Sequence, residues 1–486
     1  MKLLKHLRGY MPVSLANGLV GFGSVYVFTR LLGGEDYGRY AILFSCMALL
    51  HTFTLTWVEA AGFRFAGRAL EEGDLPGHYR TGLSLILRSL ILTAVGIGVL
   101  AVIFRNDPTY LIVLPWLFIV NAVVTFGQFA LEAHRAHQRV GRYTLAQTSR
   151  IILGFFAGAA IAYFADFGAA APFMGLLVGG LFLLGREGPW LLKQAKGGQL
   201  RAARSKAWLA FGVPVAAAMV LDILLAVSDR FLIKFYLDEM AVGAYAAGYG
   251  VADKPVLMIC AWAALGASPL LMAAYEEEGE AAAGKAASDL FRMILFLGLP
   301  AAVGLALVAE PLAEAVISED LRAQAAKIIP FIAFSGLLNG LLIHYVSESF
   351  QLVRRTDQRA LLMIVPVIVN LVLNVVLIQR VGVMGAVYAT VISYGLGVLL
   401  LGAFGRRLLR LPVPLDEILK VGIAALAMWP VLSVMPDLGS WAELLLKSLA
   451  GGTIYMLVAV LLNAGGSRDL LKAWLNRKET IHAGTD

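Results

Sequence analysis

The chain contains about fourteen apolar runs, most of them close to the length that a helix needs to cross a bilayer. Such continuous runs are too long for barrel strands, and lipid-exposed backbone must satisfy its own hydrogen bonds, which a helix does. The runs are 10–32, 37–61, 83–104, 110–131, 145–165, 169–184, 207–227, 242–267, 291–308, 328–350, 360–378, 383–404, 418–435 and 441–462. The sequence therefore predicts an all-α polytopic membrane protein with about 14 transmembrane helices.

The composition of the chain also indicates that it folds in a lipid bilayer. Hydrophobic residues make up 59% of the chain and charged residues 15%, against roughly 45 to 50% and about 25% in soluble domains. The two cysteines, Cys46 and Cys260, both fall inside predicted spans, so we expect neither a structural disulfide nor a metal site. No connection exceeds roughly 25 residues, which is too short for a folded catalytic domain. We therefore do not expect an enzyme.

Charge placement tests the number of spans. With the N-terminus inside, about 28 of the 40 Lys and Arg fall on one side and about 9 on the other. This bias predicts that both termini are cytoplasmic. The net charge of +7 is then explained by the basic loops on the cytoplasmic side. Because these cations are scattered over loops, no nucleic-acid partner is expected.

An internal repeat organises the chain. Leu32–Ala41 (LGGEDYGRYA) returns as Leu237–Ala246 (LDEMAVGAYA), about 205 residues later. Six spans separate the copies, so the halves enter the membrane from the same side. We predict two pseudo-symmetric six-helix bundles around a central cavity, with the repeats as outer turns in which the Gly lets the chain turn and the Tyr lies at the interface. The predicted parts are an N-terminal bundle (1–192), a cytoplasmic linker (193–206), a C-terminal bundle (207–410), an extra helix pair (411–465) and a cytoplasmic tail (466–486).

Several segments together resemble a known family. They are Leu32–Tyr40, Asp229–Lys234 (DRFLIK) followed by Val242–Tyr245, and Gly382–Thr390 (GVMGAVYAT). With the number of spans, they resemble the Wzx-type polysaccharide flippases of the multidrug/oligosaccharidyl-lipid/polysaccharide (MOP) exporter superfamily. The resemblance implies an alternating-access flippase in the bacterial inner membrane. Its substrate would be a polyprenyl-pyrophosphate-linked oligosaccharide, moved from the cytoplasmic to the outer leaflet. Implied partners are membrane lipids and polysaccharide polymerase or export proteins.

Charges inside spans are the candidate binding residues, because each costs about 2.5 to 3.5 kcal/mol at a helix centre. Asp253 and Lys254 lie deepest, in the eighth span. Tyr245, Tyr249 and Asp253 recur at four-residue spacing and share a face, while Lys254 points about 100° away. This stripe suits a sugar ring stacked on tyrosine with its hydroxyls on a carboxylate. A packing salt bridge for Asp253 is the structural alternative.

Arginines suit the anionic end of the substrate, because a guanidinium offers a planar fork of donors to phosphate oxygens. Candidates in or beside the spans are Arg30, Glu59, Arg64, Arg88, Arg150 and Asp222. Snorkelling to the interface explains the arginines equally well, and a packing salt bridge explains Asp222. The polar faces of Asn121, Thr125, Gln128 and Glu132, and of His344 and Glu348, are more typical of interhelical hydrogen bonds.

No nucleotide is expected to drive transport. Gly279–Lys285 matches the P-loop pattern, but Ala286 replaces its Ser or Thr, and Glu276–Glu278 precede it. The remaining sources of energy are an ion gradient, of protons or sodium, the membrane potential, and downstream removal of the product. Two other functions stay open: a cation-coupled multidrug exporter of the same superfamily, and a membrane glycosyltransferase or polymerase. The extra helix pair argues against the first, and the lack of a large outer loop argues against the second.

Overall fold

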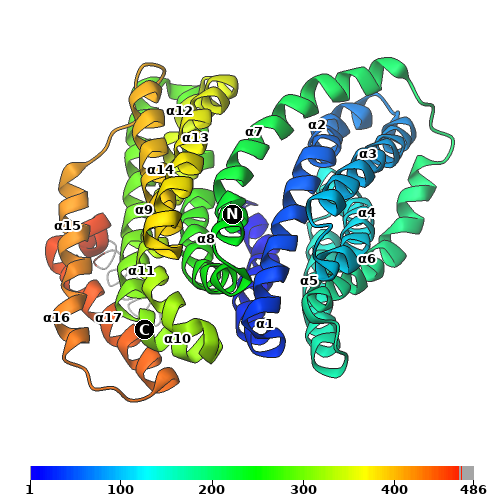
Figure 1. Cartoon of the computed structure of the whole chain (residues 1–486). Helices are drawn as coiled ribbons and strands as arrows, with labels where there is room; N and C mark the ends of the chain where they lie inside the picture. The colour runs from blue at the N-terminus through cyan, green and yellow to red at the C-terminus, as the bar shows by residue number, and fades with distance from the viewer. Residues whose placement is uncertain (1, 470–471, 473–486) are drawn as a thin grey trace, which may run out of the picture. The chain divides into compact units, whose positions relative to one another are not determined.

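A computed structural model describes residues 2–469 and 472. The described residues form helices with short connections and no strand (Figure 1). The α-helices are α1 (Lys2–Thr54), α2 (Thr56–Glu71), α3 (Leu75–Ile103), α4 (Pro108–Ala136), α5 (Val140–Phe164), α6 (Ala171–Ala195), α7 (Ala202–Tyr236), α8 (Glu239–Glu278), α9 (Glu280–Leu307), α10 (Ala309–Val316), α11 (Glu319–Leu341), α12 (Glu348–Leu352), α13 (Thr356–Val381), α14 (Val383–Gly405), α15 (Leu415–Leu426), α16 (Met428–Ser433) and α17 (Ser440–Leu462). Short segments η1 (Gly168–Ala170), η2 (Leu342–Val346, a π-helix) and η3 (Ala464–Gly466) complete the set. Most of the predicted tail, including Arg477 and Lys478, lies outside the described residues.

Twelve helical segments in the described chain are long and apolar enough to cross a membrane. The predicted fold class is confirmed, but the number of fourteen spans is not. The first predicted run and most of the second fall within α1, although Gly33 (φ 73°, ψ 170°) leaves helical geometry between them, and the second run continues into α2. The thirteenth run is divided between α15 and α16, which are each too short to span.

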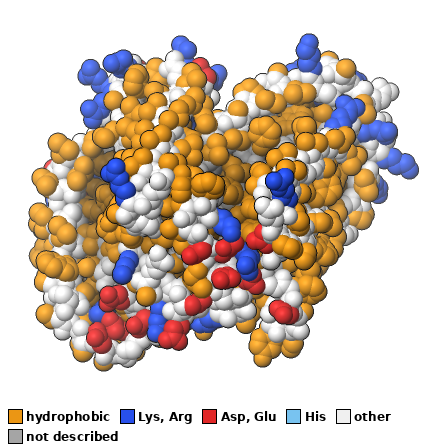
Figure 2. Space-filling view, in the orientation of Figure 1, with side chains coloured by type: hydrophobic (Ala, Val, Ile, Leu, Met, Phe, Trp, Pro, Cys, Tyr) orange, Lys and Arg blue, Asp and Glu red, His pale blue; other side chains and the backbone are white. Residues whose placement is uncertain are grey.

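Contacts within the chain divide it into two compact units, unit 1 (Met1–Ala246) and unit 2 (Ala247–Asp486). In Figure 2 apolar side chains cover most of the visible surface of each unit, as expected of a surface that faces hydrocarbon. Within unit 2, Lys and Arg are frequent at the end near α12 in this view, and most visible Asp and Glu lie toward the opposite end. The predicted domain limits and central cavity stay predictions.

Glycines let the helices α5 and α6 pack closely in unit 1. Gly154 and Gly158 on α5 lie against Gly175 and Gly179 on α6. A Cβ added at Gly175 would lie 2.5 Å from the Gly158 Cα, and one at Gly179 would lie 3.1 Å from the Gly154 Cα. Both pairs have the small-xxx-small spacing that lets membrane helices approach backbone to backbone.

The two copies of the repeat pack against each other. A Cβ added at Gly243 would lie 2.5 Å from the Gly34 carbonyl oxygen, and one at Gly38 would collide with the Glu239 carbonyl. The contact is therefore reciprocal between the second half of α1 and the start of α8. Our interpretation that Gly38 and Gly243 let the chain turn is wrong, because both lie inside helices, and the break in α1 occurs at Gly33.

The connection from α6 to α7 is tied to the turn between α2 and α3. Arg204 Nη2 donates to Asp74 Oδ2 at 2.5 Å, and Arg201 Nη1 lies 3.7 Å from the same oxygen. Asp74 also caps α3 by accepting the Gly77 N–H at 3.2 Å. The Arg204 guanidinium holds the pKa of Asp74 below its usual value. This ion pair fixes the start of α7, which packs along α2.

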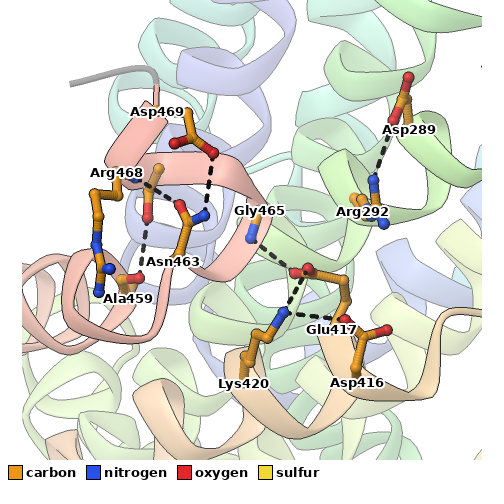
Figure 3. A network of polar contacts seen from close by, with 11 residues as sticks. Asp289, Arg292, Asp416, Glu417, Lys420, Ala459, Asn463, Gly465, Arg468 and Asp469 are labelled. Atoms are coloured by element: carbon orange, nitrogen blue, oxygen red, sulfur yellow. Dashed lines mark hydrogen bonds and ion pairs between the residues drawn. The ribbon is translucent and has the colours of Figure 1, made fainter. Parts of the chain in front are cut away.

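In unit 2, α9, α11, α13 and α14 pack together, and the pair α15 and α17 packs on α9. Figure 3 shows how the pair is closed at one end. The buried Glu417 accepts the Gly465 N–H at 2.8 Å and the Lys420 ammonium at 3.2 Å. Asn463, in left-handed geometry (φ 53°), ends α17 and accepts the Arg468 N–H at 3.0 Å. The start of α15 is thus bonded to the end of α17.

The contact between the two repeats predicts that adding one methyl group at Gly38 lowers the stability of the protein, whereas adding one at an open glycine does not. Gly38→Ala places a Cβ against the Glu239 carbonyl, so the backbone must shift at a cost of about 1 to 3 kcal/mol. Gly98→Ala on α3 is the matched control, because no atom lies within 4 Å of its Cβ. We expect the thermal midpoint of the purified protein to fall for Gly38→Ala and not for Gly98→Ala. Equal midpoints would contradict the tight contact.

The ion pair between Asp74 and Arg204 predicts a dependence on pH. Because folding lowers the pKa of Asp74, its stabilisation is complete above about pH 4, the unfolded value, and is lost as the pH falls through the folded value. Asp74→Asn should lower the free energy of unfolding by about 1 to 2 kcal/mol at pH 7. The difference from wild type should shrink at pH 3.

The control is Asp107→Asn, which alters a similar helix cap on α4, where Oδ1 accepts the Thr109 N–H at 3.0 Å. A chemical-denaturation series at both pH values measures the effect. An Asp74→Asn deficit that persists at pH 3 would contradict the ion pair as the source of the stabilisation.

Candidate functional site: a charged cluster inside unit 1

The second predicted span is interrupted at Leu55. The threonines on both sides of Leu55 donate to carbonyl groups of α1. Thr54 Oγ1 donates to the Leu50 carbonyl at 2.7 Å, and Thr56 Oγ1 to the His51 carbonyl at 3.4 Å. The Trp57 indole N–H also donates to the Thr54 carbonyl at 3.0 Å. Hydroxyls that return to backbone carbonyls bend helices. The chain therefore ends α1 and restarts as α2 within one apolar segment.

Two ionisable side chains meet across this interruption. His51, near the end of α1, lies with Nε2 at 3.3 Å from Glu59 Oε2, near the start of α2. Asn121 from α4 also contacts the His51 ring. The second carboxylate oxygen, Glu59 Oε1, is buried and has no hydrogen-bond partner among the described residues. A buried acceptor of this kind costs about 1 to 3 kcal/mol unless a ligand or water satisfies it.

An arginine completes the group. Arg150 on α5 is half-buried, and its Nε donates to Gln147 Oε1 at 3.2 Å. It forms no ion pair with Glu59, but the two charges are close enough to act on each other, and Arg150 also acts on His51. We call His51, Glu59, Asn121, Gln147 and Arg150 the unit 1 polar cluster.

The unit 1 polar cluster combines three chemistries in an apolar surrounding. A guanidinium can bind phosphate oxygens, a carboxylate can accept hydroxyl groups, and an imidazole can exchange protons near neutral pH. Four helices supply the side chains, so a relative movement of these helices would change the distances between the charges. Among the described residues no group of three or more His, Cys, Asp or Glu side chains is arranged to hold a metal ion.

Two of the ten predicted site residues, Glu59 and Arg150, are brought together in this cluster. Three predicted arginines, Arg30, Arg64 and Arg88, have exposed side chains. The Arg30 guanidinium lies 4.1 Å from the centre of the Tyr26 ring and donates to the Tyr26 carbonyl at 3.0 Å. An exposed arginine on a membrane helix fits both a cavity and the interface, so the roles of these three stay predictions.

The predicted stripe on α8 is buried. Tyr245 is fully buried, and its hydroxyl donates to Asp229 Oδ2 on α7 at 2.5 Å. Tyr249 and Asp253 are also buried, while Lys254 is exposed, in agreement with the shared face that the four-residue spacing predicts. Tyr245 thus has a partner inside the protein already. The sugar-binding role of the stripe stays a prediction, as does that of the half-buried Asp222 on α7.

Sequence reasoning missed His51 and Asp229 as parts of polar contacts. His51 precedes Glu59 by eight residues, and three threonines at alternate positions, Thr52, Thr54 and Thr56, lie between them. A run of hydroxyls between two ionisable residues inside an apolar span was the available signal. Asp229 follows Asp222 by two helical turns, but its partner, Tyr245, lies on the next helix, and a single sequence does not reveal that contact.

Comparison with known proteins defines the class. The sequence model of a family described as "Polysaccharide biosynthesis protein" matches residues 27–322, more than half of the chain. No curated protein matches the sequence. The fold is similar to that of the lipid II flippase MurJ in an inward closed conformation, with a TM-score of 0.74 at 16% identity over 95% of this chain and 99% of that one.

Multidrug transporters share the fold to a smaller extent. An inward-facing multidrug resistance MATE family transporter of the MOP superfamily gives a TM-score of 0.62 at 14% identity, over 81% of this chain and 94% of that one. A eukaryotic MATE transporter gives 0.54 at 13% identity, over 83% and 96%. The chain is thus a multi-pass membrane protein with the fold of MOP superfamily transporters. It belongs to the polysaccharide biosynthesis protein family, as its sequence motifs predicted.

The contact between His51 and Glu59 predicts a measurable coupling. In a double-mutant cycle, His51→Ala and Glu59→Ala should interact by about 0.6 to 1.7 kcal/mol, the size found for polar pairs in membrane proteins. His51→Ala combined with Asp107→Asn is the control. Asp107 precedes α4, and Asn121 lies fourteen residues further along the chain, roughly 21 Å away at helical rise. That pair should be additive within about 0.5 kcal/mol. Equal coupling in both cycles would contradict a specific contact.

Proposed function

We propose that the chain is an alternating-access flippase for a polyprenyl-pyrophosphate-linked oligosaccharide, acting from the cytoplasmic to the outer leaflet of the bacterial inner membrane. The observation that carries the proposal is the unit 1 polar cluster in a chain of the polysaccharide biosynthesis family. In this proposal Arg150 binds the pyrophosphate, and Glu59 Oε1, which has no partner among the described residues, accepts a sugar hydroxyl. The exposed Arg64 and Arg88 would contribute further phosphate contacts.

The proposal includes a topology. Both termini and the connection 193–206 would be cytoplasmic, in line with the excess of Lys and Arg on that side. The lipid-linked oligosaccharide would then reach the protein from the cytoplasmic side, on which it is made. The resemblance supports a polysaccharide polymerase or export protein as a partner on the opposite side.

Energy coupling is assigned to the same cluster. An imidazole beside a carboxylate can gain and lose a proton as its surroundings open to one side or the other. A proton gradient is therefore our first candidate for the driving force, and a sodium gradient, with Glu59 as an oxygen ligand, is the second. No nucleotide takes part in this proposal.

A cation-coupled multidrug exporter is the second candidate function. The observation in its favour is the MATE fold, which the chain matches over 81% of its length. Arg150, whose charge lies close to the half-buried Glu59, argues for an anionic cargo, because a guanidinium repels an organic cation.

A reconstituted flipping experiment tests the function. The full chain in vesicles receives a fluorescent polyprenyl-pyrophosphate disaccharide, and a membrane-impermeant quencher reports the fraction that crosses. We expect Arg150→Gln and Glu59→Gln each to slow transfer about 10- to 100-fold, because a charge-assisted hydrogen bond is worth about 1.5 to 3 kcal/mol. Arg105→Gln, on an exposed connection, is the matched loss of charge and should transfer at the wild-type rate.

Three outcomes would count against the proposal. Wild-type rates in both cluster variants would remove the binding role from the cluster. Transport of an organic cation without transfer of the lipid would identify the exporter. Rates that do not change when a proton or a sodium gradient is imposed would remove the coupling role.

A further inference from the structure

A cavity lies inside unit 2. It has a volume of about 410 Å³ and is bounded by α9, α14, the π-helical segment η2 and the connection that follows α14. Gly402 on α14 leaves its centre open, because a Cβ there would meet only Val346 Cγ1, at 3.9 Å. The volume falls within the range of about 300 to 1,000 Å³ that holds small ligands.

The connection that covers this cavity is anchored. The Tyr345 hydroxyl, on η2, donates to the Pro412 carbonyl. The Tyr345 ring packs edge-on against Phe291 of α9 with centroids 4.9 Å apart. Leu409 and Leu411 of the connection are buried. A hydrogen bond and apolar packing therefore fix the connection over the cavity.

Among the described residues, one charged side chain, Arg406, lines the cavity. Its walls are mostly apolar, and no Asp or Glu lines it among the described residues. Arg406, at the end of α14, contributes an exposed guanidinium and forms no ion pair within the described part of the chain. Arg407 and Arg410 follow it in the same connection. An occupant that satisfies this arrangement has an apolar chain and a single anionic head.

We propose that this cavity binds an anionic phospholipid, with one acyl chain against Leu399 and Gly402 and the phosphate on Arg406. Leu399 lines the cavity and is 71% exposed, so the cavity opens at the surface of α14 and the acyl chain has a way in. Basic pockets between membrane helices on the cytoplasmic side bind anionic head groups. Arg406 lies on that side in the topology proposed above, yet binding itself does not depend on flippase activity.

Native mass spectrometry of the full chain, delipidated and then mixed with phosphatidylglycerol or phosphatidylcholine, tests the proposal. Wild-type protein should retain phosphatidylglycerol preferentially. Arg406→Gln should weaken its retention about five-fold, since one basic residue near the membrane surface is worth about 1 kcal/mol. Gly402→Phe, which fills the cavity, should abolish the retention of both lipids at this site. Added phosphatidylglycerol should also raise the thermal midpoint of wild type and not of Gly402→Phe.

Matched controls keep the test specific. Arg380→Gln removes an exposed positive charge from the end of α13, and Gly452→Phe adds a ring to α17 where no atom lies within 4 Å of a Cβ. Both should bind like wild type. Equal retention of the two lipids, or unchanged retention in Arg406→Gln, would overturn the proposal. Displacement of phosphatidylglycerol by polyprenyl phosphate at equal concentration would also overturn it, because the cavity would then belong to the transported lipid.

Discussion

Close backbone contact between helices is the interaction on which the structure depends. In hydrocarbon, two apolar helices gain little from burying their side chains against each other, so association relies on van der Waals contact and polar bonds. The glycines of α5 and α6 supply that contact in unit 1, and Gly38 with Gly243 supplies it where the two repeats meet. In unit 2 a Cβ at Gly336 on α11 would lie 3.2 Å from the Asp253 Cα on α8.

Tight packing leaves few places where a polar side chain can stay without a partner. Buried polar groups on different helices bond to each other, as Asp229 does with Tyr245 and the fully buried Glu187 with His134 at 2.8 Å. Glu59 Oε1 is one of the buried polar atoms without a partner among the described residues, because its neighbour His51 reaches only the other oxygen. An incompletely satisfied carboxylate beside an arginine is a reason to look for function there, since such groups are costly to maintain for structure alone.

The sequence predicted the fold class because span length and the distribution of Lys and Arg are properties of continuous segments. It also placed Tyr245, Tyr249 and Asp253 on one face of α8 through their spacing, although it did not predict that this face is buried. It misplaced the turn at the first repeat, because Gly33 and Gly38 are equally able to turn a chain, and only the contact of Gly38 with α8 distinguishes them. Arg150 lies close to Glu59 because α2 packs against α4 and α4 packs against α5. Contacts between helices of this kind cannot be deduced from a single sequence.

Both units contain an irregular helical segment beside a histidine and a glutamate, and neither segment itself contains a proline or a glycine. In unit 1 the helix breaks at Leu55, between His51 and Glu59. In unit 2 the π-helix η2 contains His344 and leads into Glu348, which accepts from Ser268 at 2.9 Å.

Hydroxyls return to the backbone at each of these sites. Thr54 and Thr56 do so in unit 1, and Ser347 bonds the Leu342 carbonyl at 2.6 Å in unit 2. Irregular turns of this kind free carbonyl groups and are frequent at functional sites of helices. In this chain, serine or threonine between or beside a His and a Glu in an apolar span therefore marks an interrupted helix at both sites.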